Sequence, residues 1–525
     1  MFNSNDERRI FKKRVVVFIL LNCFLVLIVL VRMFYLQVYQ SSLYKILSDK
    51  NRITIKNTLP IRGHILDSKG RVLASNKYSY TSMFDLLAVS NDERQKLIEK
   101  ALKLPLDNKV LEQLRDIPKI IKQNNRYIVL QENIDWKTLA RYYVLANSNP
   151  CICIEKTKTR YYPYSLECSH LLGYTSSPSN NDIHSTGNRV LLLPAVKIGK
   201  NGIEKQYEEL LFGTVGIQEF EVNSRRQVVR TISKTESTPG QTIELTIDLE
   251  LQKQIYKILS QYKSGSCIVM EVYTGAILAL VSYPGYDINM FSKKIPSKLL
   301  KKIYADSYKP LINKAISGLY SPGSTFKIIT GLAGLHYGII NENTKFNCSG
   351  YSELGKHKFY CWKWKYGGHG SLNLQQALEQ SCDVFFNNIA KRIDPDCIAK
   401  VAQDFGLGTK TGIDLPNEKA GLIPTKDWKY STRKQKWTMG DTYNTSIGQG
   451  FILTTPLQLV CMTAMFVNGL KTIRPHINKT APNINTKKDK LEYSEDHIQI
   501  ILDGIYNVVN SARGTARKSR LDKCE

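Results

Sequence analysis

The longest apolar run in the chain lies near its N-terminus, from Val15 to Val31, and continues past Arg32 as a second apolar segment. A run of this length can cross a bilayer as a helix. We therefore predict a transmembrane helix over residues 15–36. A buried core helix is the alternative, and it is disfavoured because such helices rarely stay apolar on every face.

Five basic residues precede this segment: Arg8, Arg9, Lys12, Lys13 and Arg14. By the positive-inside rule, residues 1–14 form a cytoplasmic tail and the bulk of the chain lies outside the cytoplasm. The apolar run is longer than that of a signal peptide, and no small-residue cleavage site follows it. These features predict an uncleaved anchor.

Downstream of the anchor, short apolar segments are separated by turn residues. Two β-hairpins are predicted, one around Asp67–Gly70 and one from Cys267 to Pro284. Both arms of the second hairpin are apolar on both faces, so its sheet must be covered by helices on both sides. A Pro-Gly break marks the start of a new pattern near residue 237. The pattern indicates an α+β chain with a mixed domain at 37–236 and a second domain at 237–525.

Composition changes this picture little. The 73 Lys and Arg residues exceed the 46 Asp and Glu residues, which gives a formal net charge of +27. The excess is spread along the chain, without a basic stripe interleaved with aromatics or a recognition-helix pattern, so we predict no nucleic-acid binding. Eleven cysteines in an exported chain raise the question of disulfides, and an odd number cannot all pair internally.

Candidate chemistry centres on the sequence SPGSTFK, in which Ser324 and Lys327 follow a Pro-Gly break and precede an apolar segment. This pattern predicts a buried helix that starts near Ser324, with both side chains on one face of its first turn. A serine needs a base to become a nucleophile, and a desolvated lysine can be that base. The same spacing recurs from Ser42, Ser260 and Ser431 in polar stretches, so context singles out Ser324.

A second polar pair, Ser381 and Asp383, precedes an apolar helical pattern, and from the residues alone a capped helix start is the better interpretation. The ordered blocks SPGSTFK, GHGSLNLQQALEQSCDVFF and TSIGQGFILTTPLQL nevertheless closely resemble the transpeptidase domain of class B penicillin-binding proteins. The upstream blocks RYYPYSLECSHLLGY and KIGKNGIEKQYEELLFGTVG resemble the pedestal domain of the elongation type.

The resemblance implies roles for four residues. Ser324 would be acylated by the D-Ala-D-Ala end of a peptidoglycan stem peptide, or by a β-lactam, and Lys327 would take its proton. Ser381 would relay protons on the leaving-group side, and Asp383 would hold the third position of the Ser-x-Asn motif. The implied function is peptidoglycan D,D-transpeptidation during cell elongation.

The resemblance also implies a setting and partners. The protein would be a single-pass protein of the bacterial inner membrane, and its catalysis would require no cofactor. Its pedestal would dock a RodA-like glycosyltransferase and an MreC-like scaffold. A β-lactamase or β-lactam sensor is disfavoured, because the anchor and the pedestal are those of the elongation type.

The third motif of the family, Lys-Thr-Gly, needs its own assignment. Lys410, Thr411 and Gly412 have the right letters, but by the resemblance this stretch is a structural turn and strand. The true motif would follow the helix end at Asn510–Glu525, where the sequence stops. We therefore expect the third motif and the last strands to be absent, which would leave the Cys267–Pro284 hairpin with an open edge. The alternative is a truncated, non-catalytic homologue that at most binds the elongation machinery.

Four potential metal ligands lie between or within the motifs: Cys348, Cys361, His369 and Cys382. Three thiolates and one imidazole would satisfy a tetrahedral structural zinc ion. Some elongation-type relatives carry a metal-binding cluster here, and Cys382 would tie the second motif to it. The competing interpretation is one disulfide, for instance Cys348 to Cys361, beside two unrelated residues.

Overall fold

The computed structural model describes residues 4–40, 53–85, 127–132, 134–148, 152–193, 196–222, 228–292, 295–480 and 490–521. The chain divides into two compact units. One is made of residues 1–60 and 214–238, and the other of residues 61–213 and 239–525. The second unit carries every predicted catalytic and metal-binding residue.

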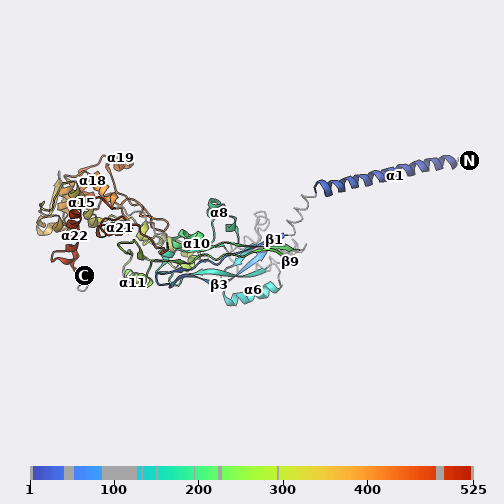
Figure 1. The fold of residues 1–525 in the computed structure, drawn as a ribbon, viewed down its shortest axis with the longest axis horizontal. Coiled ribbons are helices and arrows are strands. Elements are labelled where there is room, and N and C mark those ends of the chain that lie inside the picture. Colours follow the sequence, from blue (N-terminus) through green and yellow to red (C-terminus); the bar gives the residue numbers. More distant parts are fainter. Residues whose placement is uncertain are drawn as a thin grey trace. The chain divides into compact units, whose positions relative to one another are not determined.

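The first unit contains the apolar N-terminal segment as one helix. Helix α1, Ser4–Phe34, continues into a π-helical turn, η1, Tyr35–Tyr39 (Figure 1). An 18-residue window within residues 12–39 has a mean hydropathy of 3.0, and the helix is long and apolar enough to cross a membrane. Its large apolar side chains are exposed, which suits a surface that faces lipid.

The first unit also holds a three-stranded antiparallel sheet in the order β1-β8-β9. Its strands are β1, Ile53–Thr58; β8, Gly216–Val222; and β9, Val228–Thr235. Ile53 pairs with Glu221 and Thr58 with Gly216, so the sheet joins two segments that are far apart in the sequence.

A five-stranded sheet organises the N-terminal part of the second unit. Strands run in the order β10-β2-β3-β4, and β5 also pairs with β3 in a long antiparallel ribbon (Figure 1). The predicted hairpin around Asp67–Gly70 is confirmed, because β2 pairs with β3 and the Asp67 carboxylate accepts hydrogen bonds from the backbone N–H groups of Lys69 and Arg71. The elements of this part are β2, Ile65–Leu66; β3, Val72–Asp85; β4, Tyr127–Gln131; α6, Trp136–Ser148; β5, Ile152–Tyr161; α7, Ser169–Leu172; β6, Thr175–Ser176; α8, Asn180–Thr186; η2, Arg189–Leu192; β7, Ile198–Gly199; α9, Gly202–Gln206; α10, Glu208–Phe212; and β10, Ile243–Glu244.

A buried ion cluster fastens β5 to the short helices α9 and α10. The Glu204 carboxylate is fully buried and accepts hydrogen bonds from Arg62 Nε and Arg160 Nε, each at 2.6 Å. Arg62 also pairs with Glu208 at 2.6 Å. Because an unpaired buried charge is costly, this cluster strongly favours one arrangement of the three segments.

The second predicted hairpin is confirmed as β11, Gly265–Met270, paired with β12, Ile277–Tyr283. Helix α11, Leu249–Leu259, covers one face of the hairpin, and helices α14, Lys314–Ser317, and α21, Pro456–Val467, cover the other. The predicted sheet with helices on both faces is therefore present. Within the described residues, β11 pairs with β12 alone, and all its residues are half-buried.

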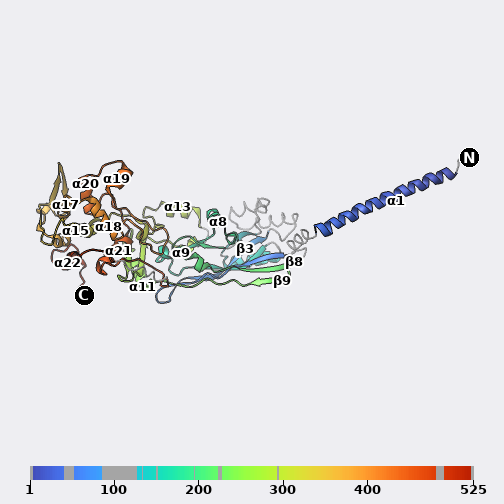
Figure 2. The same cartoon turned by 45° about the horizontal axis from the view of Figure 1, so that its top comes forward.

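Helix α15, Lys327–His336, packs against α17, Asp383–Ala390; α18, Pro395–Asp404; and α22, Glu495–Asn510 (Figures 1 and 2). Eight of its ten residues are buried, as the apolar sequence predicts. The other elements of the second unit are α12, Ile288–Phe291; α13, Ser297–Ala305; η3, Gly323–Phe326; β13, Phe346–Cys348; β14, Tyr351–Leu354; β15, His357–Tyr360; η4, Trp364–Tyr366; β16, Gly370–Leu372; α16, Leu374–Glu379; α19, Lys426–Arg433; α20, Met439–Ser446; and η5, Arg517–Ser519.

One buried histidine makes this fold sensitive to acid. His170 in α7 donates a hydrogen bond from Nε2 to the carbonyl oxygen of Pro310 at 2.6 Å, and its ring packs edge-on against Tyr286. Burial, and to a smaller extent the nearby Lys314 ammonium, lower the pKa of His170 from 6.5 to about 4. The folded protein therefore keeps this imidazole neutral at a pH where the unfolded chain protonates it.

Acidification from pH 7 to pH 4 is expected to remove about 3 kcal/mol of folding stability through His170 alone. Stability falls as the pH drops through 6.5, since the unfolded chain then binds a proton that the folded chain excludes until about pH 4. Urea unfolding of the full chain across this range should show a shallower pH dependence for His170→Gln. The exposed His357→Gln variant is the matched control and should follow the wild type. Equal slopes for all three proteins would contradict this assignment.

Candidate active site

Ser324 lies in the 3-10 turn η3, and helix α15 begins at Lys327 rather than near Ser324 as predicted. The difference arises because the backbone N–H of Lys327 bonds the carbonyl oxygen of Ser324, an i to i+3 contact that tightens the helix start. The Ser324 side chain is exposed, whereas Lys327 is 1% exposed. The structure thus presents a hydroxyl at the surface with a buried ammonium close by.

The buried Lys327 ammonium is fully engaged by the second polar pair. Its Nζ donates to Asp383 Oδ1 at 2.7 Å, to the carbonyl oxygen of Ser381 at 2.9 Å and to Ser381 Oγ at 3.0 Å. These are three acceptors for the three N–H donors of a lysine. The four sequence-predicted residues therefore belong to one connected site.

Ser381 stands between the lysine and the serine. Its Oγ donates to Ser324 Oγ at 3.0 Å while accepting from Lys327 Nζ. Ser381 has a φ of 53°, a left-handed conformation that is uncommon for a residue with a Cβ atom. In this structure Lys327 reaches Ser324 through Ser381, a link that the spacing of the motif alone did not predict.

Asp383 begins helix α17, but it does not cap it. The N-cap residue is Cys382, and no side chain makes a capping hydrogen bond there, so the interpretation of the pair as a helix cap is wrong. Burial raises the pKa of the Asp383 carboxyl above its ordinary value, and the Lys327 ammonium offsets part of that rise. The Asp383 carboxylate therefore accepts a hydrogen bond from Lys327 instead of capping helix α17.

The four cysteine and histidine candidates converge beside this site. Their ligand atoms, from Cys348, Cys361, His369 and Cys382, all lie within 4.8 Å of one another. His369 Nδ1 is 3.5 Å from the sulfur atoms of both Cys348 and Cys361. A zinc ion with bonds of about 2.3 Å places tetrahedral ligand atoms about 3.8 Å apart, so this cluster matches the size of such a site.

The chemistry of the donor set also suits a metal ion. Burial lowers the pKa of His369, which favours the neutral imidazole that binds metals. Hydrogen bonds from Cys361 and Cys382 lower the pKa of the Cys348 thiol. Cys348 and Cys361 are both free thiols, so the competing Cys348–Cys361 disulfide is absent from this structure.

Two further positions support the site and were not singled out from the sequence. Trp362 donates from its indole to the carbonyl oxygen of Gln380 at 3.0 Å, and its backbone N–H bonds the Asp383 carboxylate. The carbonyl oxygen of Gly448 accepts a hydrogen bond from the N–H of Gly323, directly before the nucleophile. In the sequence, only the position of Trp362 next to Cys361 indicates that it could belong to the site. For Gly448 the only indication is that it lies within the block TSIGQGFILTTPLQL, which resembles the family.

The Lys410–Gly412 triplet forms a turn that another residue closes. The Glu418 carboxylate accepts hydrogen bonds from Thr411 N, Thr411 Oγ1 and Gly412 N at 2.7 to 3.1 Å. Arg474 Nε donates to the carbonyl oxygen of Gly412 at 3.0 Å. These contacts are those of a structural turn.

Two family models match the chain in succession. The penicillin-binding protein dimerisation domain matches residues 57–245, and the penicillin binding protein transpeptidase domain matches residues 265–523. The second match contains Ser324 and every residue joined to it. A chain with an N-terminal apolar helix, these two domains and this serine–lysine site is a class B penicillin-binding protein.

Relatives place the chain more narrowly. The peptidoglycan D,D-transpeptidase MrdA of Acinetobacter baumannii is 33% identical over 475 residues, which span 90% of this chain and 70% of the relative. MrdA of Escherichia coli is 32% identical over 98% of this chain and 82% of the relative. The solved complex between penicillin-binding protein 2 and MreC from Helicobacter pylori aligns with a TM-score of 0.76, 31% identity and coverage of 89% of this chain and 87% of that chain. The chain belongs to the elongation-type family of peptidoglycan D,D-transpeptidases.

Removing the Ser381 hydroxyl should slow acylation of Ser324 by penicillin by about 10²- to 10³-fold, because Ser381 Oγ is the atom that joins Lys327 to the nucleophile. Ser381→Ala keeps the Cβ atom, so the backbone at this position meets no new strain. The measurement is the rate of labelling of the full chain by a fluorescent penicillin. Thr325→Ala, which removes a neighbouring exposed hydroxyl, should label at the wild-type rate. An unchanged rate in Ser381→Ala would contradict the relay.

Proposed function

We propose that this chain crosslinks peptidoglycan through an acyl-enzyme formed on Ser324. The observation that carries the proposal is the continuous path from the exposed Ser324 hydroxyl through Ser381 Oγ to the buried Lys327 ammonium. Ser324 in the η3 turn directly precedes the N-terminus of helix α15. The positive end of the helix dipole there favours negative charge on the substrate oxygen.

In the first step, Ser324 Oγ attacks the carbonyl carbon of the penultimate D-Ala of a stem peptide. The peptide bond to the terminal D-Ala breaks, Lys327 in its neutral amine form takes up the serine proton by way of Ser381 Oγ, and that proton then passes to the leaving amine. In the second step, the amine of another stem peptide attacks the ester, and its proton returns along the same path to Ser324. The products are one crosslink, one free D-Ala and the regenerated serine.

A β-lactam acylates the same hydroxyl. Opening of the lactam ring forms the ester with Ser324 but leaves no small amine free to depart, so the acyl-enzyme persists. Penicillin labelling and crosslinking therefore report on one nucleophile.

The proposed setting is the bacterial inner membrane, with residues 1–14 in the cytoplasm and the two domains outside. The similarity to the H. pylori complex supports an MreC-like scaffold as partner. A peptidoglycan synthase complex described for its coordination of polymerization and crosslinking covers 96% of this chain, at a TM-score of 0.67, and supports a RodA-like glycosyltransferase as the second partner.

The test is acyl transfer by the full chain in detergent, with a thioester analogue of the D-Ala-D-Ala end as donor and a D-amino acid as acceptor. Thiol release and the new amide product should both appear with the wild type and fall to background in Ser324→Ala. Ser431→Ala alters an exposed Ser-x-x-Lys pair elsewhere and should leave both unchanged. Absence of turnover in the wild type would favour the non-catalytic homologue.

We also propose that Cys348, Cys361, His369 and Cys382 hold a structural zinc ion. With four protein ligands the site leaves no open position for substrate, which is typical of structural rather than catalytic zinc. The ion would supply rigidity. Because Cys382 lies between Ser381 and Asp383, a metal bond to its sulfur would restrain the backbone that presents both side chains to Lys327.

Purified full chain should contain about one zinc ion per molecule by elemental analysis. Cys382→Ser should lose most of the metal, because three ligands remain, whereas Cys397→Ser, a half-buried cysteine outside the cluster, should keep it. Removal of the metal from wild type by a chelator should also lower the thermal midpoint. A metal-free wild type, or equal metal content in both variants, would overturn the assignment.

A further inference from the structure

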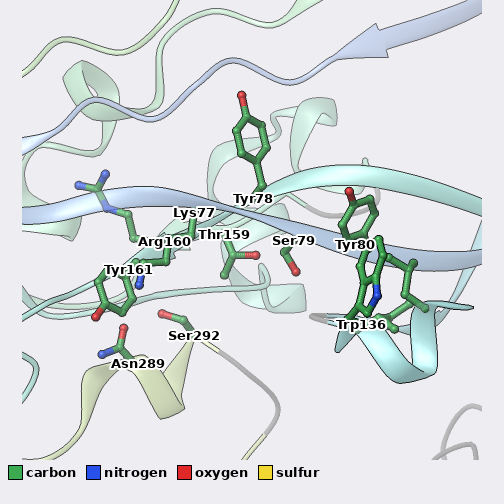
Figure 3. A pocket seen from close by; sticks show the side chains of 12 residues that line it. Lys77, Tyr78, Ser79, Tyr80, Trp136, Thr159, Arg160, Tyr161, Asn289 and Ser292 are labelled. Carbon is green, nitrogen blue, oxygen red and sulfur yellow. The ribbon is translucent and has the colours of Figure 1, made fainter.

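A cleft of about 500 Å³ lies in the second unit, between strands β3 and β5, helix α6 and the short helix α12 (Figure 3). None of its lining residues belongs to the serine site or to the cysteine cluster. The lining consists of Lys77, Tyr78, Ser79, Tyr80, Ile134, Trp136, Leu139, Thr159, Arg160, Tyr161, Asn289 and Ser292. The volume falls in the range of small-molecule binding sites.

The lining has hydroxyl groups in the middle and aromatic rings at its two ends. Figure 3 shows Ser79 and Thr159 between an end that carries Tyr161 and Ser292 and an end that carries Trp136. Ser79 and Thr159 come from neighbouring strands, since β3 and β5 pair in register here. This lining suits a ligand with flat faces that stack on the aromatic rings and with polar groups that form hydrogen bonds to the hydroxyl groups between them.

One end of the cleft also carries a fixed cation. The Lys77 ammonium lies 3.1 Å from the centroid of the Tyr161 ring, a cation–π contact. No carboxylate is among the lining residues. This charge distribution favours an anionic or neutral ligand over a cationic one.

The walls of the cleft are held in place by contacts behind them. The Asn289 side chain bonds both the N–H and the carbonyl oxygen of Tyr162, which ties α12 to the end of β5. Arg160 is locked by Glu204 and by the carbonyl oxygen of Gly63, each at 2.6 Å. Contacts of this kind make a site that is formed before a ligand arrives, which lowers the entropic cost of binding.

Trp136 points to a ligand more directly. It is the first residue of α6, and 79% of its surface is exposed at the rim of the cleft. Burial of a tryptophan side chain removes a large apolar area from water, which is favourable. Tryptophan is also enriched among the residues that contribute most to binding at interfaces. Leu139, one turn further along the same helix, is buried and lines the cleft below. A ring that stacks on Trp136 would therefore cover apolar surface that now faces water.

We propose that this cleft binds the glycan strand of peptidoglycan. The amino sugars of that polymer offer faces to Trp136, hydroxyl and acetamido groups to Ser79 and Thr159, and carboxylates to Lys77. The choice of this polysaccharide among anionic polyhydroxyl ligands rests on the proposed crosslinking function. The cleft would hold the strand whose stem peptides are being joined, so that the serine site meets its substrate at a high local concentration.

The experiment uses the full chain in detergent and soluble glycan strands freed of stem peptides by an amidase. Such strands lack the D-Ala-D-Ala end, so the Ser324 site does not retain them. Calorimetry should show binding to wild type, and Trp136→Ala and Lys77→Gln should each bind about tenfold more weakly. Tyr143→Ala, an exposed aromatic residue on the same helix that does not line the cleft, should bind as the wild type does.

Penicillin labelling of the same variants separates this site from the serine site. Trp136→Ala and Lys77→Gln should label at the wild-type rate, and Ser324→Ala should keep its glycan binding even if crosslinking fails. Absence of binding by the wild type, or wild-type binding by both cleft variants, would overturn the proposal. Loss of an MreC-like or RodA-like partner in Trp136→Ala with glycan binding intact would assign the cleft to a protein interface and would also overturn it.

Discussion

The structure of the candidate site depends on one constraint, which is that the Lys327 ammonium is buried and must be neutralised and hydrogen-bonded where it lies. A lysine that is 1% exposed needs acceptors for three donors, and all three come from Ser381 and Asp383. One of these acceptors, Ser381 Oγ, is also the group that donates to Ser324 Oγ. Because the buried Lys327 ammonium needs hydrogen-bond acceptors, it determines where Ser381 and Asp383 lie relative to the nucleophile Ser324.

That constraint extends to the segments around the site. Ser381 adopts a left-handed backbone conformation, which persists only where neighbouring contacts hold it. Those contacts come from Lys327 on one side and, through Cys382, from the cysteine and histidine cluster on the other. Trp362 adds hydrogen bonds to Gln380 and Asp383. A metal ion in the cluster would stiffen the same segment and would join the second motif to the cluster.

Much of this could be predicted from the sequence, because the signals were local. The apolar N-terminal run, the two hairpins and the helix after Ser324 follow from periodicity and turn residues, and the structure contains them all. The link from Lys327 to Ser324 through Ser381 could not be predicted from spacing, because it depends on a tertiary contact over more than fifty residues. The cleft at Trp136 was equally hidden, since its walls come from strands and helices far apart in the sequence.

The most direct test of this account is peptide mapping by mass spectrometry after the full chain has been incubated with benzylpenicillin. The account predicts a penicilloyl adduct on the peptide that contains Ser324, because this exposed hydroxyl is the one joined to Lys327 through Ser381. The adduct should disappear in Ser324→Ala. An adduct confined to another residue, or no adduct on a folded wild-type protein, would contradict the assignment of Ser324 as the nucleophile.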